Sequence, residues 1–103
     1  MIVKRIAVLV PCYNEAATVA AVVRGFRRAL PAAEVYVYDN NSTDGTAACA
    51  REAGATVRQE GGQGKGHVVR RMLAELDADI YIMVDGDDTY DPASSPAMIE
   101  RML

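Results

Sequence analysis

The sequence alternates between short strand-like runs and amphipathic segments, and it does so four times along the chain. The strand-like runs occupy residues 5–10, 34–38, 56–59 and 79–84, and the first of them is a continuous β-branched and aliphatic run, as is typical of a strand buried on both faces. Each run is followed by a segment with helical periodicity, at residues 15–30, 44–53, 66–76 and 95–103. This order predicts an α/β fold: a Rossmann-like, three-layer parallel sheet built from four βα units.

The first amphipathic segment has the clearest helical pattern. Its apolar residues recur at the 3.6-residue period and predict a buried stripe, which consists of Val19, Val22, Val23, Phe26 and Leu30. Pro31 ends this helix, because proline cannot continue it without steric conflict. Gly54 is expected as the C-terminal cap of the second helix.

The composition agrees with one small soluble domain of 103 residues, because apolar residues make up 50% and charged residues 24% of the chain. The longest apolar stretch, residues 6–13, is too short to cross a membrane, and no signal-peptide cleavage site follows it. The net charge of −3 disfavours nucleic acid as a partner. Cys12 and Cys49 are expected to be reduced and partly buried, which predicts a cytoplasmic location.

Polar residues follow each predicted strand, at residues 11–15, 39–44, 61–65 and 85–91. In a parallel sheet the carboxyl ends of the strands meet at one edge, and ligands bind in the crevice outside that edge. The four loops are therefore expected to face one crevice, and we predict the ligand site there.

The acidic loop Asp85-Gly86-Asp87-Asp88 places carboxylates two positions apart after the last predicted strand. Gly86 allows the tight turn that lets Asp85 and Asp87 converge on one cation. Oxygen ligands of this kind suit Mg²⁺ or Mn²⁺. The alternative is a solvated acidic turn, and the spacing alone leaves both interpretations open.

The glycine-rich loop at residues 61–66 is suited to holding phosphate groups at the start of the third predicted helix. It does not fit the P-loop pattern, because Gln59 and Gly66 occupy positions that require glycine and serine or threonine. It does not fit the dinucleotide-binding pattern either, since that pattern follows the first strand. Lys65 either pairs with a diphosphate or is an ordinary surface lysine.

The first two loops hold three further candidates. Asp39 either accepts hydrogen bonds from a ribose hydroxyl or a base imino group, or forms a turn with the asparagines that follow it. Tyr13 either stacks on a base or packs as a half-buried aromatic residue. Glu15 favours the helix dipole in any case. Residues 42–45 have the composition of an ordinary helix cap.

Together these loops resemble those of the family 2 glycosyltransferases, whose catalytic domain has the GT-A nucleotide-sugar fold. The resemblance rests on four segments in the same order, VPCYNEAATV, YDNNSTDGTA, GGQGKGHVVR and VDGDDTYDP, and it covers essentially the whole chain. The combination of GKG with DGDDTYDP is similar to the branch that makes polyprenyl-phosphate sugars, the dolichol-phosphate mannose or glucose synthase type.

The resemblance implies a nucleotide-sugar site made of Pro11, Tyr13, Glu15, Asp39, Lys65, Asp85 and Gly86. In this assignment Tyr13 lies near the base, and Asp39 binds the base or the ribose. Asp85 and Asp87 form the D-x-D motif, which holds Mg²⁺ or Mn²⁺ at the diphosphate of a UDP- or GDP-sugar. The implied reaction transfers the sugar with inversion, and the implied acceptor is a polyprenyl phosphate at the membrane.

A complete GT-A domain is longer than this chain, so residues 1–103 are interpreted as its donor-binding half. The catalytic residues are expected in the other half, and the full-length form at the cytoplasmic face of a membrane. Two alternatives stay open: a truncated, inactive nucleotide- or metal-binding module, and a family 2 enzyme acting on a saccharide or other hydroxyl acceptor. A truncated sheet exposes an edge and an apolar face, which predicts a homo-oligomer.

Overall fold

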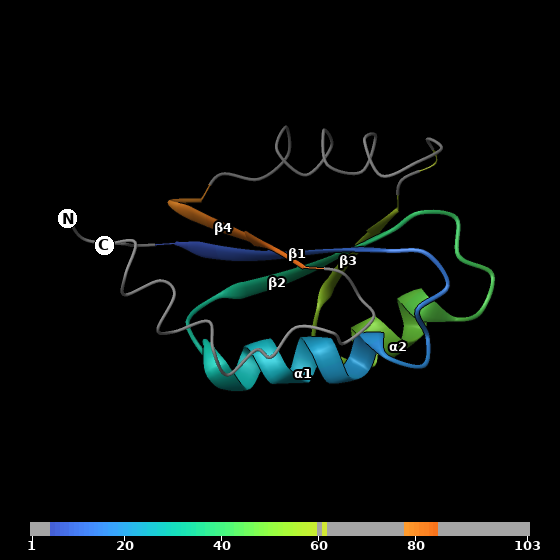
Figure 1. Ribbon diagram of the computed structural model, residues 1–103, viewed down its shortest axis with the longest axis horizontal. Helices are drawn as coiled ribbons and strands as arrows, with labels where there is room; N and C mark the ends of the chain where they lie inside the picture. Colours follow the sequence, from blue (N-terminus) through green and yellow to red (C-terminus); the bar gives the residue numbers. More distant parts are fainter. Residues whose placement is uncertain (1–4, 60, 62–77, 85–103) are drawn as a thin grey trace.

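The computed structural model describes residues 5–59, 61 and 78–84 of the chain (Figure 1). Within these residues one sheet has the strand order β3-β2-β1-β4, and every neighbouring pair is parallel. The strands are β1 (Ile6–Cys12), β2 (Glu34–Asp39), β3 (Thr56–Gln59) and β4 (Ile80–Met83), and the helices are α1 (Val19–Ala29) and α2 (Thr46–Ala53). The predicted α/β fold with a parallel sheet is confirmed, whereas the helices predicted at 66–76 and 95–103 lie outside the described residues.

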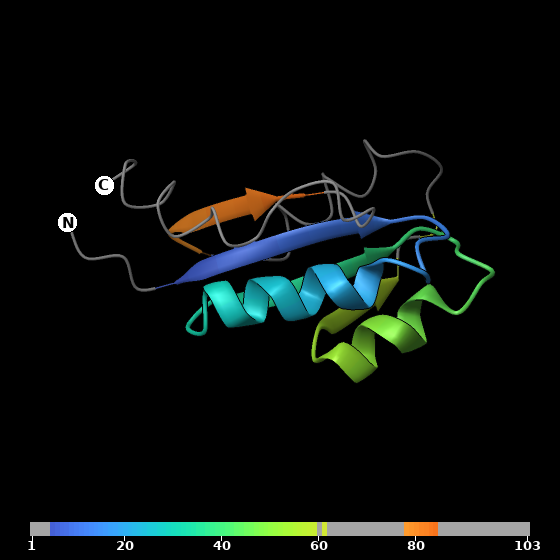
Figure 2. The same ribbon diagram turned by 60° about the horizontal axis from the view of Figure 1, so that its bottom comes forward.

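Both described helices pack against the same face of the sheet, below the strands in Figure 1 and in front of them in Figure 2. The predicted apolar stripe of α1 is buried there, and Val19, Val23 and Phe26 are fully shielded from solvent. Alternate residues of the two central strands complete this core: Val8, Val10, Val35 and Val37. The opposite face carries a smaller cluster, formed by Ala7, Leu9, Tyr36 and Tyr38.

The first strand is longer than predicted, because it continues through Pro11 to Cys12. Pro11 pairs in register with Tyr38 of β2. The ladder between β1 and β4 ends at the pair of Leu9 and Met83, and the Leu9 carbonyl faces β4. By strand alternation the missing N–H of Pro11 faces β4 as well, beyond that last pair, so proline costs no ladder hydrogen bond here.

The first helix is shorter than predicted at its start, because it begins at Val19 rather than at Glu15. Residues 16–18 form a turn instead, in which the N–H groups of Thr18 and Val19 donate to the Glu15 carbonyl oxygen at 3.1 and 2.8 Å. The N–H groups of Glu15 and Ala16 donate to side chains of the next loop. These contacts to a distant segment shape the chain before the regular helix begins.

The second helix ends at Gly54, which was expected to cap it and does so in the left-handed conformation with φ of 107°. Its N–H bonds back to the Arg51 carbonyl oxygen at 3.0 Å. Arg27 of α1 crosses to this point, where its Nη1 atom donates to the Ala53 carbonyl oxygen at 3.0 Å. The C-terminal end of α2 is therefore also a point of contact between the two helices.

Neither cysteine forms a disulfide: Cys12 is buried at the end of β1, and Cys49 is half-buried on α2. This agrees with the expectation of two free thiols. Among the residues that the structure describes, no helix combines the length and the apolar character that a membrane span requires.

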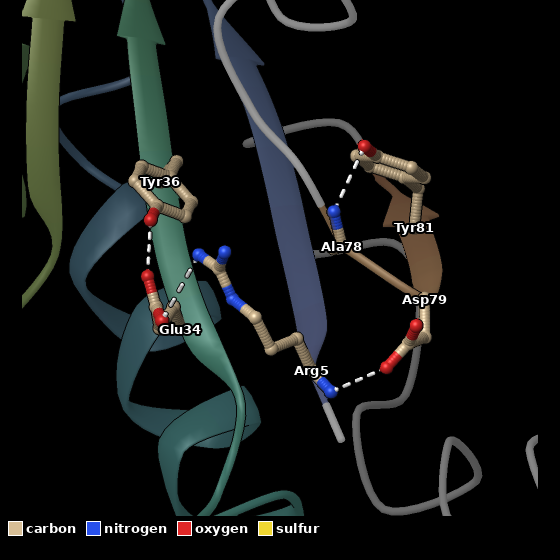
Figure 3. A network of polar contacts seen from close by, with 6 residues as sticks. All are labelled: Arg5, Glu34, Tyr36, Ala78, Asp79 and Tyr81. Atoms are coloured by element: carbon tan, nitrogen blue, oxygen red, sulfur yellow. Dashed lines mark hydrogen bonds and ion pairs between the residues drawn. The ribbon is translucent and has the colours of Figure 1, made fainter. Parts of the chain in front are cut away.

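The amino ends of the strands are joined by a polar network (Figure 3). The Arg5 guanidinium lies 3.5 Å from a Glu34 carboxylate oxygen, and the Tyr36 hydroxyl donates to the same carboxylate. This hydrogen bond and partial burial raise the pKa of Tyr36. On the other side, the Arg5 N–H donates to Asp79 Oδ2 at 2.9 Å, next to the start of β4. The network lies at the edge opposite to the predicted ligand site.

Candidate functional site

The carboxyl ends of three strands lie side by side in register. Cys12 of β1 pairs with Asp39 of β2, and Asp39 pairs with Gln59 of β3. The ladder of β4 ends earlier, beside Leu9 of β1, whose carbonyl oxygen accepts the Val84 N–H at 3.0 Å. The loops after β1 and β2 therefore leave the sheet next to one another, as the parallel topology predicts (Figure 1).

Asp39 is a buried carboxylate at this edge, with 4% of its surface exposed. Its Oδ1 atom accepts a hydrogen bond from the Ser42 N–H at 3.2 Å. Asn41, in the left-handed region at φ of 63°, donates its side-chain amide to the Gly61 carbonyl oxygen at 3.3 Å. Asp39 thus forms the turn that its sequence neighbours predict, and this turn fixes where the carboxylate lies.

Pro11 and Tyr13 flank Cys12 but differ in exposure. Pro11 is buried within β1, so its contribution is to the shape of the strand end. The Tyr13 side chain is 62% exposed at the ligand edge. Such exposure argues against the interpretation of Tyr13 as a half-buried packing residue. It leaves a ring face available for stacking on a base.

Asn14 ties the loop after β1 to the loop after β2. Its N–H donates to Ser42 Oγ at 2.8 Å, and its side-chain oxygen accepts from the Thr43 N–H at 2.9 Å. Asn14 has a φ of 53°, in the left-handed region that asparagine tolerates better than most residues. The turn at Asn14 therefore directs the chain from the exposed Tyr13 toward the neighbouring loop.

A second group of contacts reaches from the start of α2 to the same loop. The Glu15 N–H donates to Thr46 Oγ1 at 3.0 Å, and the Ala16 N–H donates to Asp44 Oδ2 at 3.1 Å. Asp44 Oδ1 in turn accepts hydrogen bonds from the hydroxyl and the N–H of Thr46. These bonds, that of the Thr46 hydroxyl above all, lower the pKa of Asp44.

Glu15 is half-buried, and its side chain stays local to the turn. One carboxylate oxygen, Oε2, accepts a hydrogen bond from the Thr18 hydroxyl at 3.4 Å. The backbone of Glu15 faces the neighbouring loop, while its carboxylate supports the entry to α1. Its place at this edge agrees with the predicted position, although the regular helix starts only at Val19.

The sequence analysis missed Asn14, Asp44 and Thr46 as residues that shape this edge. The interpretation of residues 42–45 as a helix cap is confirmed, because the N-cap of α2 is Gly45 and Asp44 Oδ1 accepts the N–H of Thr46, the first residue of the helix. The available signals were an asparagine directly after a strand and an aspartate two positions before a threonine. Neither shows which atoms pair, because the pairing depends on how β1 and β2 lie in register.

Part of the predicted site lies outside the described residues: Lys65, Asp85, Gly86 and Asp87. In the described part of the chain, no three side chains of His, Cys, Asp or Glu gather as a metal site would require. The assignment of a divalent ion to Asp85 and Asp87 rests on the donor chemistry, since two carboxylates suit Mg²⁺ or Mn²⁺. It stays a prediction.

The arrangement of elements and loops can be compared with known proteins. Residues 7–103 match the family described as Glycosyl transferase family 2. The chain belongs to this family. The match includes the strands, both described helices and the two interlocked loops, so the family resemblance seen in the motifs is confirmed. The polyprenyl-phosphate branch within the family stays a prediction.

Two relatives illustrate the match. The chain is 56% identical over 98 residues to protein RfbJ from Shigella flexneri, with 95% of the chain and 76% of RfbJ covered. It is 40% identical over 98 residues to glycosyltransferase AglJ from Haloferax volcanii, with 94% of the chain and 32% of AglJ covered. The chain therefore spans most of one relative and a minor part of the other.

Solved structures show the same architecture. The chain superposes on glucosyl-3-phosphoglycerate synthase from Mycobacterium tuberculosis with a TM-score of 0.86 and 29% identity, covering 97% of the chain and 40% of the synthase. That structure is a complex with Mn²⁺, UDP and glucosyl-3-phosphoglycerate, and another of the same enzyme holds Mg²⁺ and UDP. A glycosyltransferase of this architecture thus binds a divalent metal and UDP.

Proposed function

We propose that this chain forms the donor-binding half of a glycosyltransferase that takes a sugar from a UDP-sugar. The observation that carries the proposal is the carboxyl edge of the sheet, where Cys12, Asp39 and Gln59 stand in register and two interlocked loops meet. The similar synthase, a complex with UDP and Mn²⁺, supports a uridine nucleotide as the donor.

The proposal gives each described loop one task. The exposed ring of Tyr13 stacks on the base, and the Asp39 carboxylate accepts a hydrogen bond from the base imino group or the ribose. Pro11 and Glu15 shape the pocket from the end of β1 and the entry to α1. A nucleotide placed in this way lies across the carboxyl edge of the sheet.

The remaining predicted residues complete the diphosphate end of the proposed site. Lys65 supplies a cation for the phosphates, and Gly86 allows the turn between the two carboxylates that hold Mg²⁺ or Mn²⁺, Asp85 and Asp87. A divalent ion there would neutralise charge that develops on the leaving diphosphate. The structures of the similar synthase with Mn²⁺ or Mg²⁺ support a metal of this class.

For the acceptor we propose a polyprenyl phosphate, on the strength of GKG and DGDDTYDP in the sequence. A phosphate oxygen is anionic at neutral pH, so it attacks the sugar with little help from a general base. A hydroxyl-bearing acceptor is the second candidate, because the similar synthase forms a complex with phosphoglyceric acid. A hydroxyl acceptor needs a general base, which would have to come from other residues of the complete enzyme.

The test of donor binding is thermal unfolding of the chain with UDP, GDP or ADP, each with Mn²⁺ and again with a chelator. A nucleotide at 100 times its Kd adds about 2.7 kcal/mol to the free energy of unfolding, provided that it binds only the folded state. For a domain of this size that raises Tm by roughly 10 °C or more. A shift with UDP and Mn²⁺ alone supports the proposal, and no shift with any nucleotide refutes it.

Copies of this chain are also proposed to associate through β4. Among the described strands β4 lies at the edge of the sheet, and it exposes Tyr81 and Met83, at 37% and 42% of their surfaces. An edge strand that carries apolar side chains is a ready partner for another strand. Light scattering tests this: a dimer or larger species supports the proposal, and a monodisperse monomer refutes it.

A further inference from the structure

The loops after β1 and β2 hold each other through hydrogen bonds between backbone N–H groups and side-chain oxygens. The consecutive N–H groups of residues 14–16 donate to Ser42, Thr46 and Asp44, respectively. In the other direction, the Asn14 side-chain oxygen accepts a hydrogen bond from the Thr43 N–H. The backbone that directly follows Tyr13 is therefore fixed by atoms of the neighbouring loop.

We infer that Asn14, Asp44 and Thr46 form a loop latch, in which Asp44 is a positioning residue for the nucleotide site. The latch sets the backbone of residues 14–16 and so holds the Tyr13 ring where a base can stack on it. The inference rests on the proposed function, because it assigns to the latch an effect on nucleotide affinity. It assigns no contact between Asp44 and the nucleotide.

Asp44 is the central member of the latch because its two oxygens support two different amides. Oδ2 accepts directly from the Ala16 N–H at 3.1 Å. Oδ1 accepts a hydrogen bond from the Thr46 hydroxyl, so the lone pairs of that hydroxyl are free to accept the Glu15 N–H. Without the carboxylate, the N–H groups of Ala16 and Thr46 lose their acceptor, and the hydroxyl of Thr46 loses its fixed orientation.

Tyr13 depends on this support because it has little packing of its own. With 62% of its surface exposed, its ring is not held by the core. On its amino side it is anchored by Cys12, whose carbonyl oxygen accepts from the Asn40 N–H at 2.9 Å. On its carboxyl side the anchor is the latch. Loosening the latch should therefore leave the core intact and let the Tyr13 ring move.

Asp79, at the opposite edge of the sheet, is a control that separates an effect on the position of Tyr13 from a general effect on stability. Asp79 is exposed, like Asp44, and its carboxylate also accepts a backbone N–H from a distant segment, that of Arg5, at 2.9 Å. Figure 3 shows this contact at the amino ends of the strands, whereas the loop latch follows the carboxyl ends of β1 and β2. Asp79→Asn therefore makes the same chemical change, from carboxylate to amide, at a contact outside the proposed site.

The test compares the whole chain with its Asp44→Asn and Asp79→Asn variants. An amide has one acceptor oxygen, so the side chain introduced by Asp44→Asn cannot serve both Ala16 and Thr46. In titrations with UDP and Mn²⁺ we expect Asp44→Asn to weaken binding by about five- to tenfold, the scale of one lost hydrogen bond. Asp79→Asn should stay within about twofold of the parent chain, since a hydrogen bond altered far from the site leaves the site unchanged.

Amide hydrogen exchange supplies a readout that needs no nucleotide. We expect faster exchange at the N–H groups of Glu15 and Ala16 in Asp44→Asn, with core amides such as those of Val8 and Val37 unchanged. If exchange at these two amides is unchanged in Asp44→Asn, the loop latch does not exist. If exchange is faster but UDP affinity is undiminished, the latch exists but Asp44 is not a positioning residue. If the parent chain binds no UDP, the proposed function fails, and the exchange result alone still decides whether the latch exists.

A second pair of variants covers the case in which Asp44→Asn does not fold. Thr46 is fully buried, so its substitutions must stay close to it in size. Thr46→Ser keeps the hydroxyl and should retain most of the UDP affinity. Thr46→Val keeps the shape but removes the hydroxyl, and it should weaken UDP binding and speed exchange at the Glu15 N–H. Equal behaviour of the two variants overturns the proposal.

Discussion

Replacement of Gly54 by alanine tests how the two helices are joined. Gly54 has a φ of 107°, and a Cβ atom built on it would lie 2.0 Å from Arg27 Nη1 and 2.6 Å from Arg27 Cζ. The guanidinium would have to swing away and give up its hydrogen bond to the Ala53 carbonyl oxygen. The substitution therefore combines backbone strain with the loss of an inter-helix contact.

The magnitude follows from these two effects. A non-glycine residue in the left-handed region costs about 1–2 kcal/mol. The hydrogen bond from Arg27 adds about 1 kcal/mol, at the low end for a charged donor because the Arg27 side chain is exposed. Gly54→Ala should thus lower the free energy of unfolding by about 2–3 kcal/mol.

Gly45→Ala is the matched control, because Gly45 is also left-handed, at φ of 87°, but has nothing within 4 Å of its Cβ position. It should show the backbone strain alone, about 1–2 kcal/mol. Urea unfolding measures both variants, and Arg27→Ala combined with each completes a double-mutant cycle. In the Arg27→Ala background the cost of Gly54→Ala should fall to that of Gly45→Ala. If Gly54→Ala and Gly45→Ala lower the free energy of unfolding equally when Arg27 is present, the reasoning is refuted.

Three further predictions concern side chains at different depths. Tyr13→Ala should weaken UDP binding by about fivefold or more, the scale of base stacking, with stability nearly unchanged in the same titration and melt. Phe26→Ala, at a fully buried position, should cost about 3–5 kcal/mol in urea unfolding. The pKa of Tyr36 is raised in the folded state, so its protonated hydroxyl stabilises the fold at pH values below the unfolded pKa of 10.0, and this contribution is lost as the pH rises above it. In alkaline unfolding curves, the difference in free energy of unfolding between the parent chain and Tyr36→Phe should therefore shrink.

The sheet could be predicted from sequence because its signals are local. The predicted strand at residues 34–38 lies within β2, which is buried from Val35 on, and the apolar stripe of α1 is buried as the helical period requires. A buried strand needs only a run of apolar residues, and a buried helix face needs only their spacing. Gly54 as a helix end was also predicted, since few residues other than glycine adopt that conformation readily.

The ends of elements could not be predicted, because distant contacts decide them. The extension of β1 to Cys12 depends on pairing with Asp39, and the late start of α1 depends on the amides of Glu15 and Ala16 finding acceptors in another loop. Propensity in residues 15–18 favours helix, and these contacts override it. The same reason explains why the contact between Asp44 and the Ala16 N–H could not be predicted.

The two edges of the sheet differ in what holds them, and the difference bears on function. At the amino edge an ion pair and a side-chain hydrogen bond join Arg5, Glu34 and Tyr36, and the backbone amides of Arg5 and Ala78 are each held by a side chain. At the carboxyl edge the side chains of one loop hold three consecutive backbone amides of another, at residues 14–16, which fixes the path of that loop. A loop held in this way keeps its shape while its exposed side chains differ. An exposed side chain on such a loop, as that of Tyr13 is, can therefore be placed without packing of its own in the core.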